Sequence, residues 1–171
     1  HDLMVPFVKN LPIPLGGAAL LLAVLVIVGS SNAVNLTDGL DGLASGTLLV
    51  SALSFAIFAY LAGHARLSHY LRIVPVPGAG ELTVLLAAVG GACLGFLWFN
   101  AHPAEIFMGD TGSLPLGGAL GVVALCLQQE LILVVTGGIF VAEALSVLLQ
   151  IGSIRLLNGR RVFRMAPLHH H

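Results

Sequence analysis

Charged side chains are scarce in this sequence: aspartate, glutamate, lysine and arginine make up only 9% of its 171 residues. Soluble domains carry about 25%. Together with a hydrophobic content of 57%, this deficit excludes an ordinary soluble domain and predicts an all-α integral membrane protein. Cysteine is nearly absent too, and Cys93 and Cys126 lie inside apolar segments, where we expect buried hydrophobes rather than a disulfide or metal site. A formal net charge of −1 gives no indication of nucleic-acid binding.

Long apolar stretches are what the sequence has instead, and several approach the ~20 residues that a helix needs to span a bilayer. We predict a single membrane domain over residues 1–171, a polytopic helical bundle with about five spans at 15–31, 43–63, 82–99, 114–128 and 131–154. The first fourteen residues are expected to form a loop. Because successive spans alternate in direction, one membrane face should collect the segments 32–42, 100–113 and 155–171. Four arginines favour the cytoplasm for that face: Arg155, Arg160, Arg161 and Arg164.

The stretch from Asn35 to Gly46 interrupts this apolar pattern with two carboxylates, Asp38 and Asp41. An aspartate inside lipid costs about 3 kcal/mol, so we expect both at the aqueous boundary. If Asp38 opens the second helix, Asp41 lies on the same face one turn later. Acidic oxygens beside bare glycine backbone suit a divalent cation and a phosphorylated substrate. The alternative interpretation is a polar turn in which Asp38 only caps the next helix.

A second polar interruption contains Phe107 and Asp110, and the predicted topology brings it to the same face. Asp110 is interpreted as a third carboxylate of a site; the alternative is a loop residue in a sequence where Ser113 caps the next helix. Phe107 either anchors at the membrane interface or stacks on a base. Glu143 lies within the last predicted span, with Gln150 two turns further on the same face. An intramembrane glutamate is either a functional residue or a polar contact between helices.

Three motifs together resemble one family. They are Asn35–Gly46, Phe99-Asn100 with Phe107–Ser113, and Ala166-Pro167-Leu168 followed by three histidines. In this order they are similar to the phospho-N-acetylmuramoyl-pentapeptide transferases, within the polyprenyl-phosphate N-acetylhexosamine-1-phosphate transferase superfamily. The aspartate-glycine stretch is shared across the superfamily, and the Pro-Leu-His-His-His tail points to the muramoyl-pentapeptide branch. The resemblance also indicates that the terminal histidines are native residues rather than a purification tag.

This resemblance implies a ten-helix bacterial inner-membrane enzyme, usually a homodimer, whose active site faces the cytoplasm. It implies a Mg²⁺-dependent reaction that transfers phospho-MurNAc-pentapeptide from UDP-MurNAc-pentapeptide to undecaprenyl phosphate. The products would be UMP and the first lipid intermediate of peptidoglycan synthesis.

Residue roles follow from the same motif match. The resemblance makes Asp110 the Mg²⁺ ligand, with Asp38 beside it as a second metal-associated carboxylate. The catalytic residues would be Asp38, Asp41, Asp110 and His169. The substrate-binding residues would be Asn35, Gly39, Leu40, Asp41, Asn100, Phe107, Ser113, Gln150, His169 and His170. Phe107 is expected to stack on uracil and the two histidines to reach phosphates, whereas Glu143 receives no role and is predicted to be structural.

The sequence also departs from the family pattern. The family's amino-terminal half carries a paired-aspartate motif and a basic cluster for the polyprenyl phosphate, and a last span follows the histidines; this sequence has none of them. We therefore expect a fragment that is inactive alone. One alternative function is transfer from UDP-GlcNAc. From other classes, the alternatives are a transporter or channel subunit with broken helices near Glu143, and a catalytically silent membrane scaffold.

Overall fold

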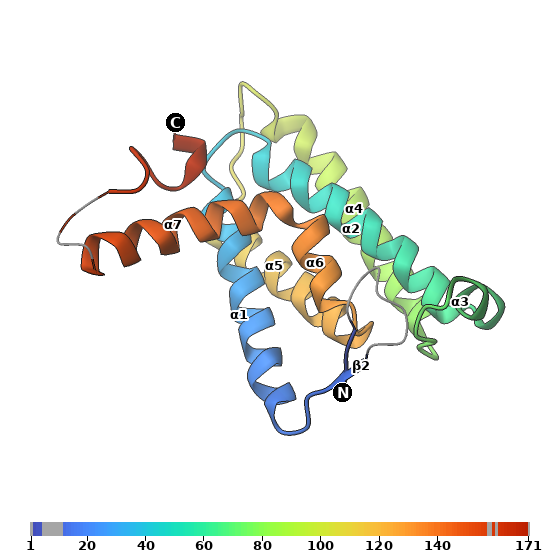
Figure 1. The fold of residues 1–171 in the computed structure, drawn as a ribbon. Helices are drawn as coiled ribbons and strands as arrows, with labels where there is room; N and C mark the ends of the chain where they lie inside the picture. The colour runs from blue at the N-terminus through green and yellow to red at the C-terminus, as the bar shows by residue number, and fades with distance from the viewer. Residues whose placement is uncertain (1, 5–11, 157–158, 160, 171) are drawn as a thin grey trace.

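Seven α-helices and one short pair of antiparallel strands form the fold of the described residues (Figure 1). The computed structural model describes residues 2–4, 12–156, 159 and 161–170. Arg160 and His171, which belong to the predicted C-terminal segment 155–171, therefore lie outside the described residues. In chain order, the elements are β1 (Asp2–Met4), β2 (Pro12–Pro14), α1 (Ala18–Thr37), α2 (Leu43–Gly63), α3 (Ala65–Leu71), α4 (Ala79–Asn100), α5 (Gly109–Cys126), α6 (Glu130–Thr136), α7 (Gly138–Leu156) and a 3₁₀ helix (Leu168–His170).

Four of these helices are long and apolar enough to cross a membrane: α1, α2, α4 and α7, with mean hydropathies of 1.7 to 2.1. Only 11% to 39% of each apolar stretch is buried inside the structure. Large apolar side chains such as Leu20, Trp98 and Leu148 point outward, which lipid tolerates and water does not. The protein is an all-α polytopic membrane protein, and this part of the sequence prediction is confirmed.

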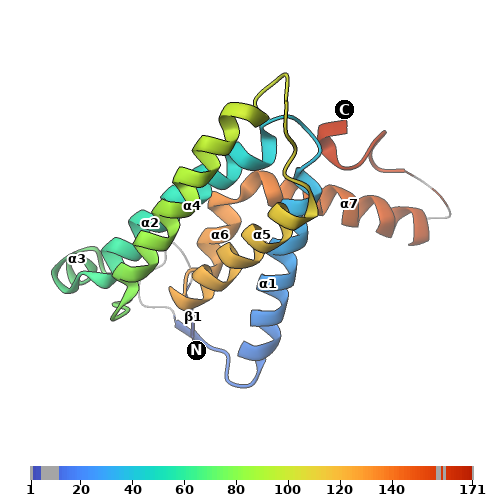
Figure 2. The ribbon, with the colours of Figure 1, turned by 180° about the vertical axis from the view of Figure 1, so that it is seen from behind.

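Helix packing relies on small residues. α2 lies along α4, and α1 lies along α5 (Figures 1 and 2). A Cβ atom added to Gly117 of α5 would lie 2.6 Å from the carbonyl oxygen of Ser30 in α1, so the two backbones touch. The hydroxyl of Ser31 donates to the carbonyl of Leu114 at 2.9 Å. This glycine-mediated contact, typical of membrane helices, fixes the second half of α1 against the first half of α5.

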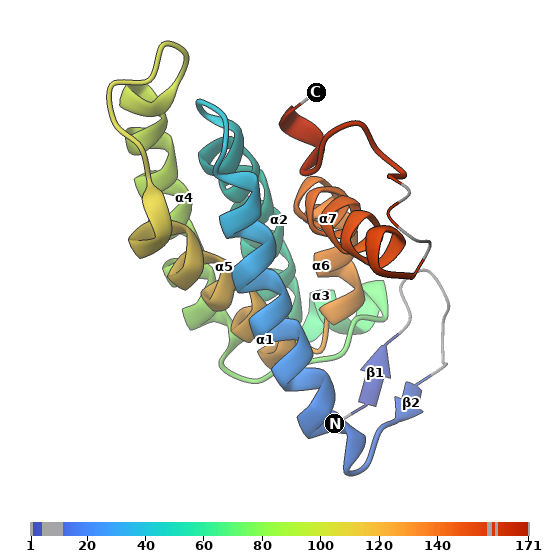
Figure 3. The same ribbon diagram turned by 90° about the vertical axis from the view of Figure 1, so that its left-hand side faces the viewer.

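The expected continuous span over residues 131–154 is wrong. α6 ends at Thr136, and α7 begins at Gly138 and runs across α1 until it extends beyond the bundle (Figures 1 and 3). Two successive glycines, Gly137 and Gly138, mark the junction, and each costs a helix about 1 kcal/mol relative to alanine. The hydroxyl of Ser51 donates to the Thr136 carbonyl at 3.1 Å, which satisfies a backbone group at the break.

The expected loop 100–113 is partly helical, because α5 begins at Gly109. Ser113 consequently lies inside α5 and does not cap it. Asp38 does not open the second helix either: it follows the last residue of α1, and α2 begins after Gly42, whose φ is 73°. The Asp38 carboxylate instead accepts the N–H of Gly109 at 2.9 Å, at the start of α5, where an anionic side chain is favourable.

Two smaller predictions also fail. The expected loop 32–42 is helical as far as Thr37, whose hydroxyl bonds back to the carbonyl of Ala33 at 2.8 Å. The first fourteen residues are not simply a loop, since β1 and β2 pair there as an antiparallel ribbon. This ribbon lies at the opposite end of the molecule from the C-terminal residues (Figure 3).

Candidate active site

Three segments that are far apart in the sequence meet at one end of the bundle (Figure 1). They are the α1–α2 loop, the α4–α5 loop and the C-terminal segment 161–170. Their contacts are specific: Asp38 bonds to Gly109, Asp41 bonds to Ala104, and the ring of His169 lies against Gly39. The predicted convergence of these three polar segments is therefore confirmed as geometry.

Asn35 and Asp38, at the end of α1, hold the beginning of α5. The side-chain amide of Asn35 donates to Asp110 Oδ1 at 2.7 Å and to Ser113 Oγ at 2.9 Å. Ser113 in turn donates to the Gly109 carbonyl at 2.9 Å. These bonds link two sequence motifs directly, and they fix the Asp110 carboxylate on the side of α5 that faces the end of α1.

The pair Asp38 and Asp110 fits a divalent cation. Burial raises the pKa of Asp38, the Gly109 N–H opposes this rise, and the neighbouring Asp110 carboxylate adds to it. Two carboxylates close enough to repel each other are stabilised by a cation between them. The described residues contain no group of three or more histidine, cysteine, aspartate or glutamate side chains arranged for a metal. Mg²⁺ needs no such group, since one or two carboxylates plus substrate phosphates are its usual partners.

Asp41 points to a different segment from Asp38. Its Oδ2 accepts the Ala104 N–H at 3.1 Å and lies 3.0 Å from Nδ1 of His102. The Ala104 N–H, and after it His102, lowers the pKa of Asp41. Both partners belong to the α4–α5 loop, so Asp41 positions the chain that leads to Phe107. Phe107 is 66% exposed, as an accessible stacking surface requires.

Asn100 is only 2% exposed, and its amide is used inside the protein. Its Oδ1 accepts from the Gly42 N–H at 3.2 Å and from the Ser45 hydroxyl at 2.7 Å. Its Nδ2 donates to the Ile106 carbonyl at 2.9 Å. Asn100, which the sequence predicts to bind substrate, therefore links the α1–α2 loop to the α4–α5 loop. Leu40, by contrast, is exposed at the α1–α2 loop.

Two residues of α7 bind the C-terminal segment. Gln150 Oε1 accepts the N–H groups of Val162 and Phe163 at 3.2 and 2.9 Å, and its Nε2 donates to the Phe163 carbonyl at 3.1 Å. Glu143 accepts the N–H of His169 at 3.1 Å. The sequence interpretation missed this contact; a lone buried glutamate in an apolar span was the one signal that could have pointed to it.

The two described histidines of the tail differ in their surroundings. The His169 ring is almost wholly buried and packs against Gly39, while His170 is exposed. Their ring centroids are 4.5 Å apart, with the planes nearly perpendicular. Of the two, only His169 is held firmly enough to present one ring nitrogen in a fixed direction.

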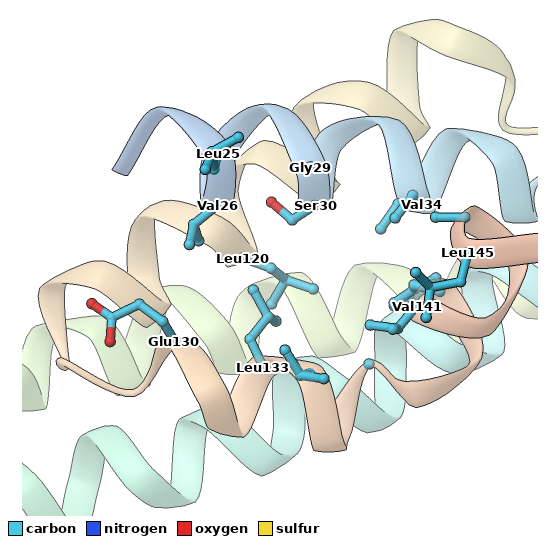
Figure 4. A pocket seen from close by; sticks show the side chains of 15 residues that line it. Leu25, Val26, Gly29, Ser30, Val34, Leu120, Glu130, Leu133, Val141 and Leu145 are labelled. Carbon is cyan, nitrogen blue, oxygen red and sulfur yellow. The ribbon is translucent and has the colours of Figure 1, made fainter. Parts of the chain in front are cut away.

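An apolar pocket of about 290 Å³ lies beside α1, along the stretch from Leu25 to Val34 (Figure 4). It is formed by α1, α5, α6 and α7, and the break between α6 and α7 helps to shape it. Its lining includes Leu25, Val34, Leu120, Leu133, Val141 and Leu145.

The sequence profile of one family, described as glycosyl transferase family 4, matches residues 2–128. The match covers most of the chain and includes both carboxylate motifs. The chain belongs to glycosyl transferase family 4. Membership in this family of transferases agrees with a site built from carboxylates and an exposed aromatic ring.

Curated relatives of this family member are similar over almost the whole chain. The proteins from Solidesulfovibrio magneticus, Desulfotalea psychrophila and Rickettsia akari are 59%, 58% and 56% identical over 169, 170 and 171 residues. Each is named phospho-N-acetylmuramoyl-pentapeptide-transferase. The matches cover 99% to 100% of this chain and 47% of each relative. The chain thus spans about half the length of the curated relatives it matches, and with the R. akari protein the match includes the terminal histidines.

Proposed function

We propose that this chain forms the metal- and nucleotide-binding half of a phospho-N-acetylmuramoyl-pentapeptide transferase. The main support is the meeting of Asp38, Asp110 and His169 from three separate segments at one end of an apolar bundle. The names of relatives that are 56% to 59% identical support the same substrate class. The reaction would move phospho-MurNAc-pentapeptide from UDP-MurNAc-pentapeptide to undecaprenyl phosphate and release UMP.

In this proposal, Asp38 and Asp110 hold Mg²⁺ at the pyrophosphate of the nucleotide sugar. Mg²⁺ supplies charge neutralisation, which lowers the repulsion between two phosphate groups and stabilises the leaving UMP. Asn35 keeps Asp110 oriented through its 2.7 Å hydrogen bond. Phe107, exposed at the end of the loop that Asp41 positions, stacks on the uracil ring.

The net covalent change at phosphorus is the same for direct transfer and for transfer through a phosphorylated enzyme. An oxygen of the acceptor phosphate forms a bond to the sugar-bearing phosphorus, and the pyrophosphate P–O bond to UMP breaks. Histidine side chains beside the carboxylates, with His169 the better fixed, would donate hydrogen bonds to phosphate oxygens during this exchange. Catalysis of this type depends mainly on positioning and electrostatics.

The acceptor carries a long hydrocarbon chain, and the structure offers apolar surface for it. The pocket between α1, α5, α6 and α7 is lined mainly by apolar side chains, and Ser30 and Glu130 are the polar members of its lining (Figure 4). Each CH₂ group that is buried contributes about 0.8 kcal/mol. If the hydrocarbon chain of the acceptor occupied this pocket, its phosphate would lie toward the end of the bundle that bears the carboxylates. The cytoplasmic orientation of that end and the assembly into homodimers remain parts of the proposal.

The test uses a full-length protein, because this chain spans about half the length of its relatives. In a full-length chimera, these residues replace the matching 47% of the S. magneticus protein. Purified chimera is mixed with undecaprenyl phosphate, Mg²⁺ and either UDP-MurNAc-pentapeptide or UDP-GlcNAc, and UMP release and lipid product are measured. We expect turnover with the first nucleotide sugar only, and much slower turnover when a short-chain prenyl phosphate replaces the acceptor. Turnover with UDP-GlcNAc alone would replace this proposal by the alternative transferase.

A further inference from the structure

Glu143 is a buried carboxylate. The hydrogen bonds and the ion pair described for its side chain all involve His169 of the C-terminal segment. The Glu143 side chain is 7% exposed and lies in the second turn of the apolar helix α7. Oε1 and Oε2 lie 3.1 and 3.4 Å from the backbone nitrogen of His169, which donates to them. Oε2 also lies 3.4 Å from Nδ1 of the same residue. A buried charge is costly unless it is paired, and here the pairing is with a residue of the candidate active site.

The imidazole of His169 is held from both edges. Its side chain is 3% exposed, and within the described residues Nδ1 has no hydrogen bond of ordinary geometry. Nδ1 lies 3.4 Å from Glu143 Oε2, while Nε2 is the ring atom nearest to the position that a Cβ atom of Gly39 would take, next to Asp38. A carboxylate beside Nδ1 favours the form with a proton on that nitrogen. The arrangement therefore directs Nε2 toward the loop that bears the carboxylates.

We propose that Glu143 is a positioning residue for His169, which fixes both the place of its backbone and the direction of its ring. The proposal rests on the function proposed above. The 3.4 Å separation from Nδ1 is longer than an ordinary hydrogen bond, and contacts of this kind often tighten when substrate binds. The prediction from sequence that Glu143 only holds helices together is replaced by this role.

Two residues of α7 bind different parts of the C-terminal segment, Gln150 its beginning and Glu143 its end. Gln150 holds residues 162–163 through three hydrogen bonds to backbone groups, so the base of the tail stays attached without Glu143. Glu143 acts further along the tail, at the histidine itself. Removing the charge of Glu143 should therefore disturb His169 and leave the rest of the tail in place.

The experiment is a double-mutant cycle in the full-length chimera. Glutamine at position 143 can still accept the His169 N–H but carries no charge to face Nδ1. We expect Glu143→Gln to lower kcat by about 10- to 100-fold, the range found when the carboxylate behind a metal-bound histidine is removed, with KM for UDP-MurNAc-pentapeptide nearly unchanged. In a His169→Ala background the same substitution should have no further effect, because residues that act as a unit are not additive.

The control is Glu81→Gln, the same change at an exposed position in the first turn of α4, which should keep wild-type kcat. Glu143→Asp, which restores the charge on a shorter side chain, should recover part of the loss. UMP binding and the melting temperature are measured for every variant to show that the site is folded. Equal losses from Glu143→Gln in both backgrounds, or no loss in either, would overturn the positioning role. A wild-type chimera that fails to transfer would instead reject the proposed function itself.

Discussion

Replacing Gly39 by alanine should place a methyl group on the imidazole of His169. A Cβ atom at this position would overlap Nε2 and would lie 2.8 and 3.0 Å from Cε1 and Cδ2. Carbon atoms in contact are ordinarily about 3.5–4.0 Å apart. The backbone φ of Gly39 is outside the left-handed region, so the substitution causes no backbone strain. Its whole effect should come from displacement of the ring by about 1 Å.

The size of the effect follows from how firmly His169 is held. Its ring is 3% exposed, and its backbone is bonded to Glu143, so it has little room to retreat. A displacement of about 1 Å can cost up to about 100-fold in rate. We therefore expect Gly39→Ala to lower kcat/KM of the full-length chimera by about 10- to 100-fold, which is roughly 1.4–2.7 kcal/mol in transition-state free energy.

The assay is the transfer reaction with UDP-MurNAc-pentapeptide, with the melting temperature as a check on folding. Gly46→Ala is the matched control. It lies in the same motif, but an added Cβ meets nothing within 4 Å, and alanine is favoured over glycine in a helix by about 1 kcal/mol. This control should keep full activity and gain slightly in stability. Wild-type activity for Gly39→Ala would refute the contact between Gly39 and His169.

Further predictions concern packing, nucleotide binding and pH. Gly117→Ala should lower the melting temperature of the chimera, since its methyl group would lie 2.6 Å from the Ser30 carbonyl and overpacking costs about 1–3 kcal/mol. Gly118→Ala, whose methyl group meets its nearest neighbour at 4.0 Å, should not; equal shifts would argue against close α1–α5 packing. Phe107→Ala should weaken UMP binding by about 1–3 kcal/mol in calorimetric titrations, and unchanged affinity would leave Phe107 an interface anchor. The lowered pKa of Asp41 means that its contacts stabilise the fold above the ordinary aspartate pKa of about 3.9 and are lost as pH falls through the lowered value. Asp41→Asn should therefore lower the melting temperature at pH 7, and the difference should shrink as the pH falls below about 4 toward the lowered pKa of Asp41; a difference that does not shrink below about pH 4 would contradict this account.

Much of the fold was predictable because a bilayer imposes a length on apolar helices. The expected span 43–63 coincides with α2, Leu43–Gly63. Convergence of the polar segments was predictable for a related reason, since carboxylates such as Asp38 and Asp110 are too costly to leave in lipid.

Hydropathy could not predict that the expected span 131–154 is divided into two helices, α6 and α7. Polar side chains are scattered along residues 131–154, at Thr136, Glu143, Ser146, Gln150 and Ser153. No local loss of hydrophobicity therefore marks the break; the signal was the glycine pair 137–138. The start of α5 was missed because its cap comes from Asp38, far away in the sequence. Residue types suggested a site, but they could not show that Asn100 is buried as a link between loops. Such roles depend on which partners the fold brings within hydrogen-bond distance.

Transfer activity of the Asp110→Asn variant tests the proposed function most directly. Asp110→Asn removes a charge beside Asp38, while its Oδ1 can still accept the amide of Asn35, which is bonded to it at 2.7 Å in the structure. In the full-length chimera with Mg²⁺ and UDP-MurNAc-pentapeptide, we predict loss of transfer with a melting temperature close to that of the wild type. Transfer at the wild-type rate at ordinary Mg²⁺ concentration would contradict the central claim that the two carboxylates hold the catalytic metal.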